Sequence, residues 1–280
     1  VVQADPYRLA RDIYGVGFKT ADRLARQLGL PVDHPSRIEA GLVYALNEMT
    51  GDGHVYSPQP TLAERAVELL EVPPDLIQPA LERLAQDGRI RCEPVPEAGL
   101  SPAGDPAAVR EPAAAYGQPA VYLSALYYGE TGVAQRLHAL NSAFPTRLSD
   151  LPPAFIALDP ALSSEQQSAI RTALSQPLSV LTGGPGTGKT TCLRALITAL
   201  ESGRKRYALA SPTGRAARRL SEAAGRPAST IHRLLAFKPG EGFTFNEQNP
   251  LAVDLLVVDE ASMLDLMLAN SLLKALSPGT

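Results

Sequence analysis

The sequence predicts an α/β domain with a parallel sheet over residues 151–280, preceded by mainly α-helical units. Apolar runs of β type occur at 179–182, 207–210 and 255–259, and helical patterns separate them. Strands that alternate with helices are typical of a parallel sheet that helices cover on both faces. Of the 25 prolines, 18 lie in residues 1–160, which indicates a loop-rich assembly of small units there.

The composition is that of a folded protein without a strong overall charge. Hydrophobic residues make up 45% of the 280 residues, which excludes a disordered or fibrous chain. The net charge of −3 gives no general attraction for nucleic acid, so such a partner has to be bound by local basic patches. No apolar run reaches about 18 residues, so we predict no membrane partner. The two cysteines, Cys92 and Cys192, lack a metal-binding spacing and favour a cytoplasmic location.

Residues 5–30 predict two short helices around a glycine turn. The turn is Gly15-Val16-Gly17, and Gly29 is expected to end the second helix. A third helix is predicted at about 36–49. The chain begins at Val1 rather than Met, and we therefore expect it to be a segment of a longer protein.

Residues 60–92 predict a second small unit. Thr61 with Glu64 has the pattern of a capping box, so a helix is expected to begin at Thr61. A second helix and a short strand over 89–92 follow, which is the order of a winged helix. A proline-rich insertion and a further helix are then predicted, at 93–119 and 121–140.

A glycine-rich segment fits the pattern of a phosphate-binding loop. The predicted strand 179–182 leads into it, and a helix is expected to open at Lys189. Backbone N–H groups at such a helix start converge on phosphate oxygens. Lys189 is expected to contact the β- and γ-phosphates of ATP, and Thr190 to offer a hydroxyl to Mg²⁺. The predicted ATP-binding residues of this loop are Gly183, Gly184, Pro185, Gly186, Thr187, Gly188, Lys189, Thr190 and Thr191.

A second acidic element follows 70 residues after Lys189. The apolar run 255–259 predicts a buried strand that ends in Asp259 and Glu260. Asp259 is expected to bind Mg²⁺ through its water shell, and Glu260 to polarise an attacking water. An apolar run that ends in Asp-Glu is often only a solvated strand end, but its pairing with the phosphate loop favours the functional interpretation. No Asn-Lys-x-Asp guanine motif occurs, which argues against a GTPase.

Two further features have both functional and purely structural interpretations. The amide of Gln166 offers one donor and one acceptor to an adenine edge, although a helical glutamine is usually just solvated. Residues 201–226 hold seven Arg or Lys against two acids. Such a stretch suits a phosphate backbone, or it is a solvated helix face.

These motifs together suggest a family. The segments containing Gln166, the phosphate loop and Asp259-Glu260 occur in helicase order, together with Ala210–Ala217 and Thr230–Leu235. The chain resembles superfamily 1 DNA helicases of the RecD type, the 5′-to-3′ branch. Its first half resembles the long RecD-like form, which carries helix-hairpin-helix and winged-helix-like units before the motor.

The resemblance implies roles for individual residues. Gln166 matches the adenine-reading glutamine, and Lys189 and Glu260 match catalytic residues. Pro212, Thr213 and Gly214 match the motif that contacts single-stranded DNA. Arg215, from the basic stretch, and His232 are further candidate DNA contacts, although His232 is equally suited to packing. Gly15, Gly17 and Lys19 match a hairpin that contacts a DNA phosphate, although such hairpins also dock proteins.

The resemblance also implies a division into four segments. The first is a helix-hairpin-helix region at 1–55, and the second is a winged-helix-like unit at 56–99. A Pro/Ala-rich insertion with a helical connector follows at 100–150. The last is a first, C-terminally truncated RecA-like ATPase domain at 151–280. We expect the second RecA-like domain, with its arginine finger, to lie outside the chain. We therefore expect the chain alone to bind ATP weakly at best and not to unwind DNA.

The implied function is an ATP-dependent DNA helicase or translocase in recombination or repair. It would move 5′ to 3′ on single-stranded DNA and act at single-strand/duplex junctions. It would use ATP and Mg²⁺, and it would work as a monomeric motor without an obligate protein partner. The alternative is a DNA-binding adaptor whose phosphate-loop domain only switches with nucleotide; Glu260 argues against it, because a switch needs no hydrolytic residue. A small-molecule kinase is a third possibility, which the segment 212–214 and the N-terminal hairpin disfavour.

Overall fold

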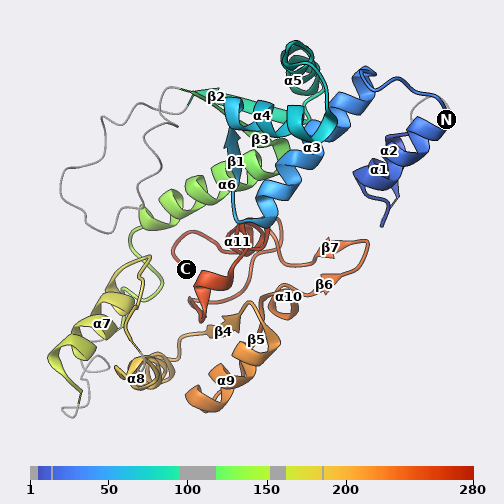
Figure 1. Cartoon of the computed structure of the whole chain (residues 1–280). Coiled ribbons are helices and arrows are strands. Elements are labelled where there is room, and N and C mark those ends of the chain that lie inside the picture. The colour runs from blue at the N-terminus through green and yellow to red at the C-terminus, as the bar shows by residue number, and fades with distance from the viewer. Residues whose placement is uncertain (1–5, 14, 95–117, 152–161, 185) are drawn as a thin grey trace. The chain divides into compact units, whose positions relative to one another are not determined.

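The computed structural model describes residues 6–13, 15–94, 118–151, 162–184 and 186–280 (Figure 1). It divides into two compact units, Val1–Tyr128 and Gly129–Thr280. The predicted four-segment division stays a prediction. In the structure, however, the first two of those segments share one hydrophobic core.

The first unit is a helical core that carries a small sheet. Its helices are α1 (Arg8–Asp12), α2 (Phe18–Gln27), α3 (Pro35–Gly51), α4 (Gln59–Leu70), the 3₁₀ helix η1 (Pro74–Leu76) and α5 (Ile77–Gln86). The predicted helices of this region are thus present. Gly29 follows α2 with φ +84°, a left-handed conformation that glycine adopts without strain. The core forms where the apolar faces of α2, α3, α4 and α5 meet.

The start of α4 differs from the prediction at Thr61. The helix begins at Gln59, and its N-cap is Pro58, which makes no side-chain cap. Pro60 occupies the first turn, where a missing N–H leaves no hydrogen bond unmade. The prolines start the helix two residues early, so Thr61 lies inside the first turn and the predicted cap is wrong.

The sheet of the first unit is antiparallel, in the order β1-β3-β2. Its strands are β1 (Tyr56–Pro58), β2 (Ile90–Pro94) and β3 (Pro119–Leu123). The predicted strand 89–92 corresponds to β2. The prediction of helix from Val121 is wrong, because Val121 pairs with Ser57 on one side and Cys92 on the other. This central strand buries its apolar residues between two partners far away in sequence, and α6 (Ser124–Asn141) begins only after it.

A buried arginine connects the helices of the first unit. Arg37 on α3 is 2% exposed and donates to Asp22 through Nε at 2.8 Å. Its Nη1 donates to the backbone oxygens of Val32 and Leu70, both at 2.8 Å. Tyr7 also donates to Asp22, at 2.7 Å. Burial opposes ionisation of Asp22, but the hydrogen bonds from Arg37 and Tyr7 hold its pKa below the usual value.

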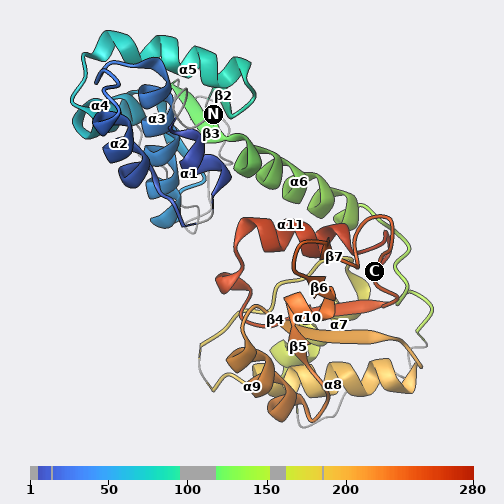
Figure 2. The same ribbon diagram turned by 90° about the vertical axis from the view of Figure 1, so that its right-hand side faces the viewer.

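The second unit contains the predicted parallel sheet, in the order β5-β4-β8. The strands are β4 (Tyr207–Ser211), β5 (Ser229–Thr230) and β8 (Leu255–Val258). Around them lie α7 (Ser164–Ser175), α8 (Lys189–Ser202), α9 (Gly214–Ala224), α10 (Ile231–Leu234), the hairpin strands β6 (Phe237–Lys238) and β7 (Gly242–Phe243), the 3₁₀ helix η4 (Ala261–Met263) and α11 (Leu266–Lys274). Figure 2 shows α8 and α9 on one side of the sheet and α11 on the other.

Alternation along β4 and β8 explains how helices cover both faces. Leu209 and Val257 pack with the apolar residues of α8 and α9, whereas Ala210 and Val258 pack with those of α11. Successive strand residues point to opposite faces, so one apolar run serves both helix layers. The predicted parallel sheet covered on both faces is confirmed.

The predicted strand 179–182 is not formed. These residues pair with none of the described strands, and Val180 is 86% exposed. The apolar character of a run indicates strand tendency, but a strand forms only where a neighbouring chain accepts its backbone hydrogen bonds. β8 lies at the outside of the order β5-β4-β8 and has no described partner on its other edge, but residues 179–182 do not pair with it.

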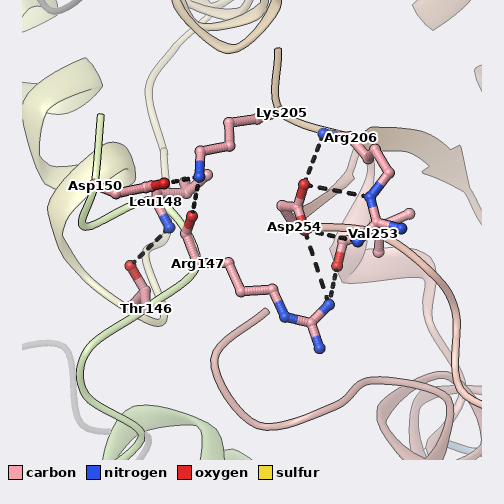
Figure 3. Close-up of polar contacts among 8 residues, drawn as sticks. All are labelled: Thr146, Arg147, Leu148, Asp150, Lys205, Arg206, Val253 and Asp254. Atoms are coloured by element: carbon pink, nitrogen blue, oxygen red, sulfur yellow. Dashed lines mark hydrogen bonds and ion pairs between the residues drawn. The ribbon is translucent and has the colours of Figure 1, made fainter. Parts of the chain in front are cut away.

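The segment 146–151 fastens the starts of β4 and β8 together (Figure 3). Lys205 Nζ contacts Asp150 and donates to the backbone oxygen of Arg147 at 2.5 Å. Arg147 Nη1 donates to the Val253 backbone oxygen at 2.6 Å. Asp254 accepts from the Arg206 backbone N–H at 2.8 Å and from its Nη2 at 3.1 Å. The clamp fixes the register of the two strands at one end of the sheet.

None of the helices in the described ranges is long and apolar enough to cross a membrane.

The Arg37 cluster makes a prediction about stability. Arg37→Ala leaves Asp22 and two backbone oxygens without their donor, so it should lower the free energy of unfolding by about 3–5 kcal/mol. Arg83→Ala is the matched control, because Arg83 pairs with Glu39 at 2.7 Å but is 42% exposed; its loss should be about 0–1 kcal/mol. Urea denaturation measures both, and equal losses would contradict the role given to Arg37.

The Asp254 clamp makes a prediction about pH. Burial raises the pKa of Asp254, but the hydrogen bonds from Arg206 outweigh it and hold the pKa below the usual value. Such a group stabilises the fold above its unfolded pKa and loses that contribution as the pH falls through its folded pKa. The second unit should therefore lose stability below about pH 4.

Asp254→Asn isolates this contribution. It should lower the free energy of unfolding at neutral pH by about 1.5–3 kcal/mol, because it removes charged hydrogen bonds. It should also flatten the acid limb of a plot of melting temperature against pH. A variant with the same acid limb as the wild type would show that Asp254 is not responsible.

Candidate nucleotide-binding site

The phosphate loop has the backbone conformation that its glycines permit. Gly186 and Gly188 have φ of +77° and +85°, in the left-handed region, and Gly188 is the N-cap of α8. α8 begins at Lys189, as predicted. Thr187 Oγ1 donates to the Gly184 backbone oxygen at 2.9 Å and closes the loop internally. The predicted residue Pro185 lies outside the described residues.

The side chains of the loop lie at the surface. Lys189 Nζ contacts the backbone oxygens of Gly183 and Gly184, the latter at 2.9 Å. Thr190 and Thr191 are exposed in the first turn of α8. The ammonium group thus lies over its own loop, and its partners among the described residues are backbone carbonyl oxygens. Phosphate oxygens, which carry full charge, are stronger acceptors for it.

Gln166 is attached to this loop. Ser163 and Gln166 form a complete capping box at the start of α7. The same Gln166 amide donates through Nε2 to the Thr187 backbone oxygen at 3.3 Å. A Cβ at Gly188 would lie 2.3 Å from that Nε2, so a side chain there would have to displace the amide as well as adopt a φ of +85°. The adenine-reading role of Gln166 stays a prediction, but its contact with the loop is established.

The two acidic residues directly follow β8. β8 is half-buried rather than fully buried as the sequence predicted, and Asp259 and Glu260 are exposed. The Asp259 N–H donates to the Ala210 backbone oxygen at 2.9 Å, which continues the pairing with β4. Glu260 has φ +54°, a conformation that residues with a Cβ seldom adopt. The chain therefore changes direction between the two acids.

The face of the sheet on which Asp259 lies follows from strand alternation. Val257 packs against α8, so Asp259, two residues further, lies on the α8 side. Tyr207, at the start of β4, donates to Glu201 near the C-terminal end of α8 at 2.7 Å, whereas Leu209 packs with Leu193 and Ile197. β4 therefore runs antiparallel to α8. The sheet residues that follow Leu209 and Val257 on this face thus lie toward the N-terminal end of α8, where the phosphate loop is.

The predicted DNA segment follows the end of β4. Pro212 and Thr213 are half-buried, and the Thr213 hydroxyl caps α9 by accepting from the Ala216 N–H at 3.2 Å. Gly214 and Arg215 are exposed at the start of that helix. The segment thus lies at the same end of the sheet as Asp259, because β4 and β8 are parallel.

The basic stretch 201–226 is largely neutralised. Four of its seven basic side chains form ion pairs: Lys205 with Asp150, Arg206 with Asp254, Arg218 with Glu222 and Arg226 with Glu201. The hydrogen bond from Arg226 lowers the pKa of Glu201 to about 2. In the described part of the chain, Arg204, Arg215 and Arg219 have no carboxylate partner, and two of these three lie on α9.

Two other predicted DNA contacts lie in different surroundings. His232 is exposed, and its ring lies 5.7 Å from those of both Phe237 and Phe243. Gly15, Gly17 and Lys19 belong to the first unit, where Lys19 Nζ lies 5.6 Å from the centre of the Tyr44 ring. The contacts of His232 and Lys19 are thus packing contacts with aromatic rings, and their DNA roles stay predictions.

Comparison with known families covers both ends of the chain. Residues 1–56 match the family described as the ATP-dependent RecD2 DNA helicase HHH domain. Residues 166–280 match the family described as AAA domain. The ATP-dependent RecD2 DNA helicase of Deinococcus radiodurans is 37% identical over 281 residues, which include 97% of this chain. Over nearly its whole length, the chain is therefore similar to a RecD2-type DNA helicase.

Other relatives match shorter stretches of the chain. The RecBCD enzyme subunit RecD of Mycobacterium tuberculosis is 40% identical over 183 residues, or 57% of this chain. The ATP-dependent DNA helicase PIF1 of Trypanosoma brucei brucei is 33% identical over 110 residues, or 39% of this chain. The chain spans 38% of the Deinococcus relative and 31% of the mycobacterial one.

Sequence reasoning missed two hydroxyl residues of the site. Ser163 accepts from the Gln166 N–H and orients the predicted adenine-reading residue; the S-x-x-Q spacing of a capping box signals it. Ser211 ends β4 with a fully buried side chain. No sequence signal marks it, because its burial depends on helices far away along the chain.

The contact between Gly188 and Gln166 makes a prediction about nucleotide affinity. Gly188→Ala introduces a Cβ in a left-handed conformation, at a cost of about 1–2 kcal/mol, and displaces Gln166. Affinity for a fluorescent ATP analogue should fall about tenfold. Gly51→Ala at the end of α3 is the control, because its Cβ would meet open space. Unchanged affinity in Gly188→Ala would contradict the described loop geometry.

Proposed function

We propose that the chain is the nucleotide-binding part of an ATP-dependent DNA helicase or translocase. The observation that carries this proposal is the arrangement of the second unit. A phosphate loop opens α8, and β8, which ends in Asp259 and Glu260, packs against that helix. Between them in the chain, β4 leads into the segment 212–214 at the same end of the sheet.

The residues present suit ATP and Mg²⁺. Gly188 turns in a left-handed conformation directly before α8, which leaves the backbone N–H groups at the start of that helix available to phosphate oxygens. Lys189 would exchange its backbone oxygens for the β- and γ-phosphates. Thr190 and Asp259 offer the hard oxygen donors that Mg²⁺ prefers. When bound, Mg²⁺ supplies positive charge beside the transferring phosphate.

Each protein group then has one task in hydrolysis. Glu260 accepts a hydrogen bond from the attacking water and orients it. The Lys189 ammonium stabilises negative charge that develops on the phosphate oxygens. Gln166 binds the adenine edge, and its hydrogen bond to the Thr187 backbone oxygen holds the amide beside the loop.

The DNA strand is proposed to follow the end of β4. Pro212, Thr213 and Gly214 would contact single-stranded DNA, with Arg215 adding positive charge at the start of α9. In the first unit, backbone N–H groups at Gly15 and Gly17, together with Lys19, are proposed to contact a phosphate near a single-strand/duplex junction. This contact adds affinity but no base specificity.

We further infer 5′-to-3′ movement, action as a monomer, a cytoplasmic location and a role in recombination or repair. The direction and the role rest on the likeness to RecD-type relatives. The location is in keeping with Cys92 and Cys192, which are both free thiols.

Hydrolysis by the natural full-length protein tests the proposal. Single-stranded DNA should stimulate ATP hydrolysis, and Lys189→Ala and Glu260→Gln should each reduce the stimulated rate at least about 100-fold. Glu260→Gln should still bind nucleotide, because it changes only the water-orienting group. Nucleotide binding without hydrolysis in the wild type would favour the adaptor alternative, and hydrolysis that ignores DNA would favour a kinase.

A further inference from the structure

Ser211 has a buried hydroxyl without a hydrogen-bond partner. Its side chain is 0% exposed, and within the described part of the chain its Oγ donates to no acceptor. Buried hydroxyl groups in proteins are normally paired, because an unpaired one loses its hydrogen bonds to water and gains none. Ser211 shares this property with Asn270 and Thr280 among the described residues, but it alone of the three lies in the parallel sheet beside the end of β8.

The register of the sheet places Asp259 beside Ser211. Ala210 is paired with Val258, and the Asp259 N–H donates to the Ala210 backbone oxygen. The next row therefore pairs Ser211 with Asp259. Residues directly opposite each other in a sheet have their side chains on the same face and about 5 Å apart at Cβ.

Both side chains lie on the face that α8 covers. Leu209 and Val257 pack against α8, and Ser211 and Asp259 follow each of them by two residues. Because β4 runs antiparallel to α8, this row lies toward the N-terminal end of the helix, where Lys189 and Thr190 are. The other neighbour of Ser211 in the sheet, Thr230, uses its hydroxyl to accept from the Arg233 N–H at 3.3 Å.

We propose that Ser211 is a positioning residue for Asp259. In the nucleotide-bound state its hydroxyl donates to the Asp259 carboxylate and fixes the carboxylate in the orientation that accepts from Mg²⁺-bound waters. Groups that orient a metal-binding carboxylate in this way contribute about 10–100-fold to metal affinity. The inference rests on the proposed Mg²⁺–ATP site and adds a residue to it.

A double-mutant cycle tests the proposal in the full chain. A fluorescent ATP analogue is titrated with Mg²⁺ and with EDTA, and the ratio of the two affinities measures the metal contribution. Ser211→Ala should reduce this ratio about tenfold, while its melting temperature stays equal to that of the wild type or rises, because an unpaired hydroxyl has been removed. In the Asp259→Asn background, Ser211→Ala should change nothing further.

Two more variants separate positioning from packing. Ser229 on β5 is paired with Ala210, so its side chain lies on the face of the sheet opposite to Ser211. Ser229→Ala therefore removes a hydroxyl from the other face and should keep the wild-type ratio of affinities with Mg²⁺ and with EDTA. Ser211→Cys keeps the size of the side chain with a weaker donor and should give an intermediate ratio.

Each remaining outcome counts against a particular claim. If the wild type shows Mg²⁺-dependent binding and Ser211→Ala keeps the same ratio, the positioning role is wrong. It is also wrong if Ser211→Ala still reduces the ratio in the Asp259→Asn background. If the wild type shows no Mg²⁺-dependent nucleotide binding, the proposed function itself fails.

Discussion

The parallel pairing of β4 with β8 is the constraint on which the rest of the second unit depends. At one end of the pair, Asp254 accepts both backbone and side-chain hydrogen bonds from Arg206, and Arg147 and Lys205 hold the preceding segment against the strand starts. A slip of one residue would move every side chain to the opposite face. The clamp therefore decides, five residues further along β8, on which face Asp259 lies.

The register of β4 and β8 determines the geometry of the proposed nucleotide site. With Leu209 and Val257 facing α8, that helix lies across the strands with its N-terminal end next to their carboxyl ends. The phosphate loop needs glycines because the chain turns in left-handed conformations and Gln166 covers Gly188. The segments proposed for phosphate binding, metal binding and DNA contact then fall at the carboxyl end of the parallel strands, although they extend along the chain from Gly183 to Glu260.

The sequence predicted correctly those elements that depend on residues close together in the chain. The start of α8 and the turn at Gly29 follow from glycine conformations, and the strands β4 and β8 follow from short apolar runs. The errors occurred where distant partners decide: residues 179–182 pair with none of the described strands, and Val121 joins two strands. The ion pairs of Lys205 with Asp150 and of Arg206 with Asp254 likewise depend on acids far away in the sequence. Pro58 and Pro60 moved the start of α4 away from Thr61. The unpaired hydroxyl of Ser211 was invisible in the sequence because its burial is a property of the assembled sheet.

A crystal structure of the protein with Mg²⁺ and a non-hydrolysable ATP analogue tests the central claim most directly. The account predicts the triphosphate on the loop 183–190, and one metal ion that Thr190 binds directly and Asp259 binds through water on the α8 side of the sheet. A metal ion bound without Asp259, or an Asp259 carboxylate directed to the face that α11 covers, would contradict it.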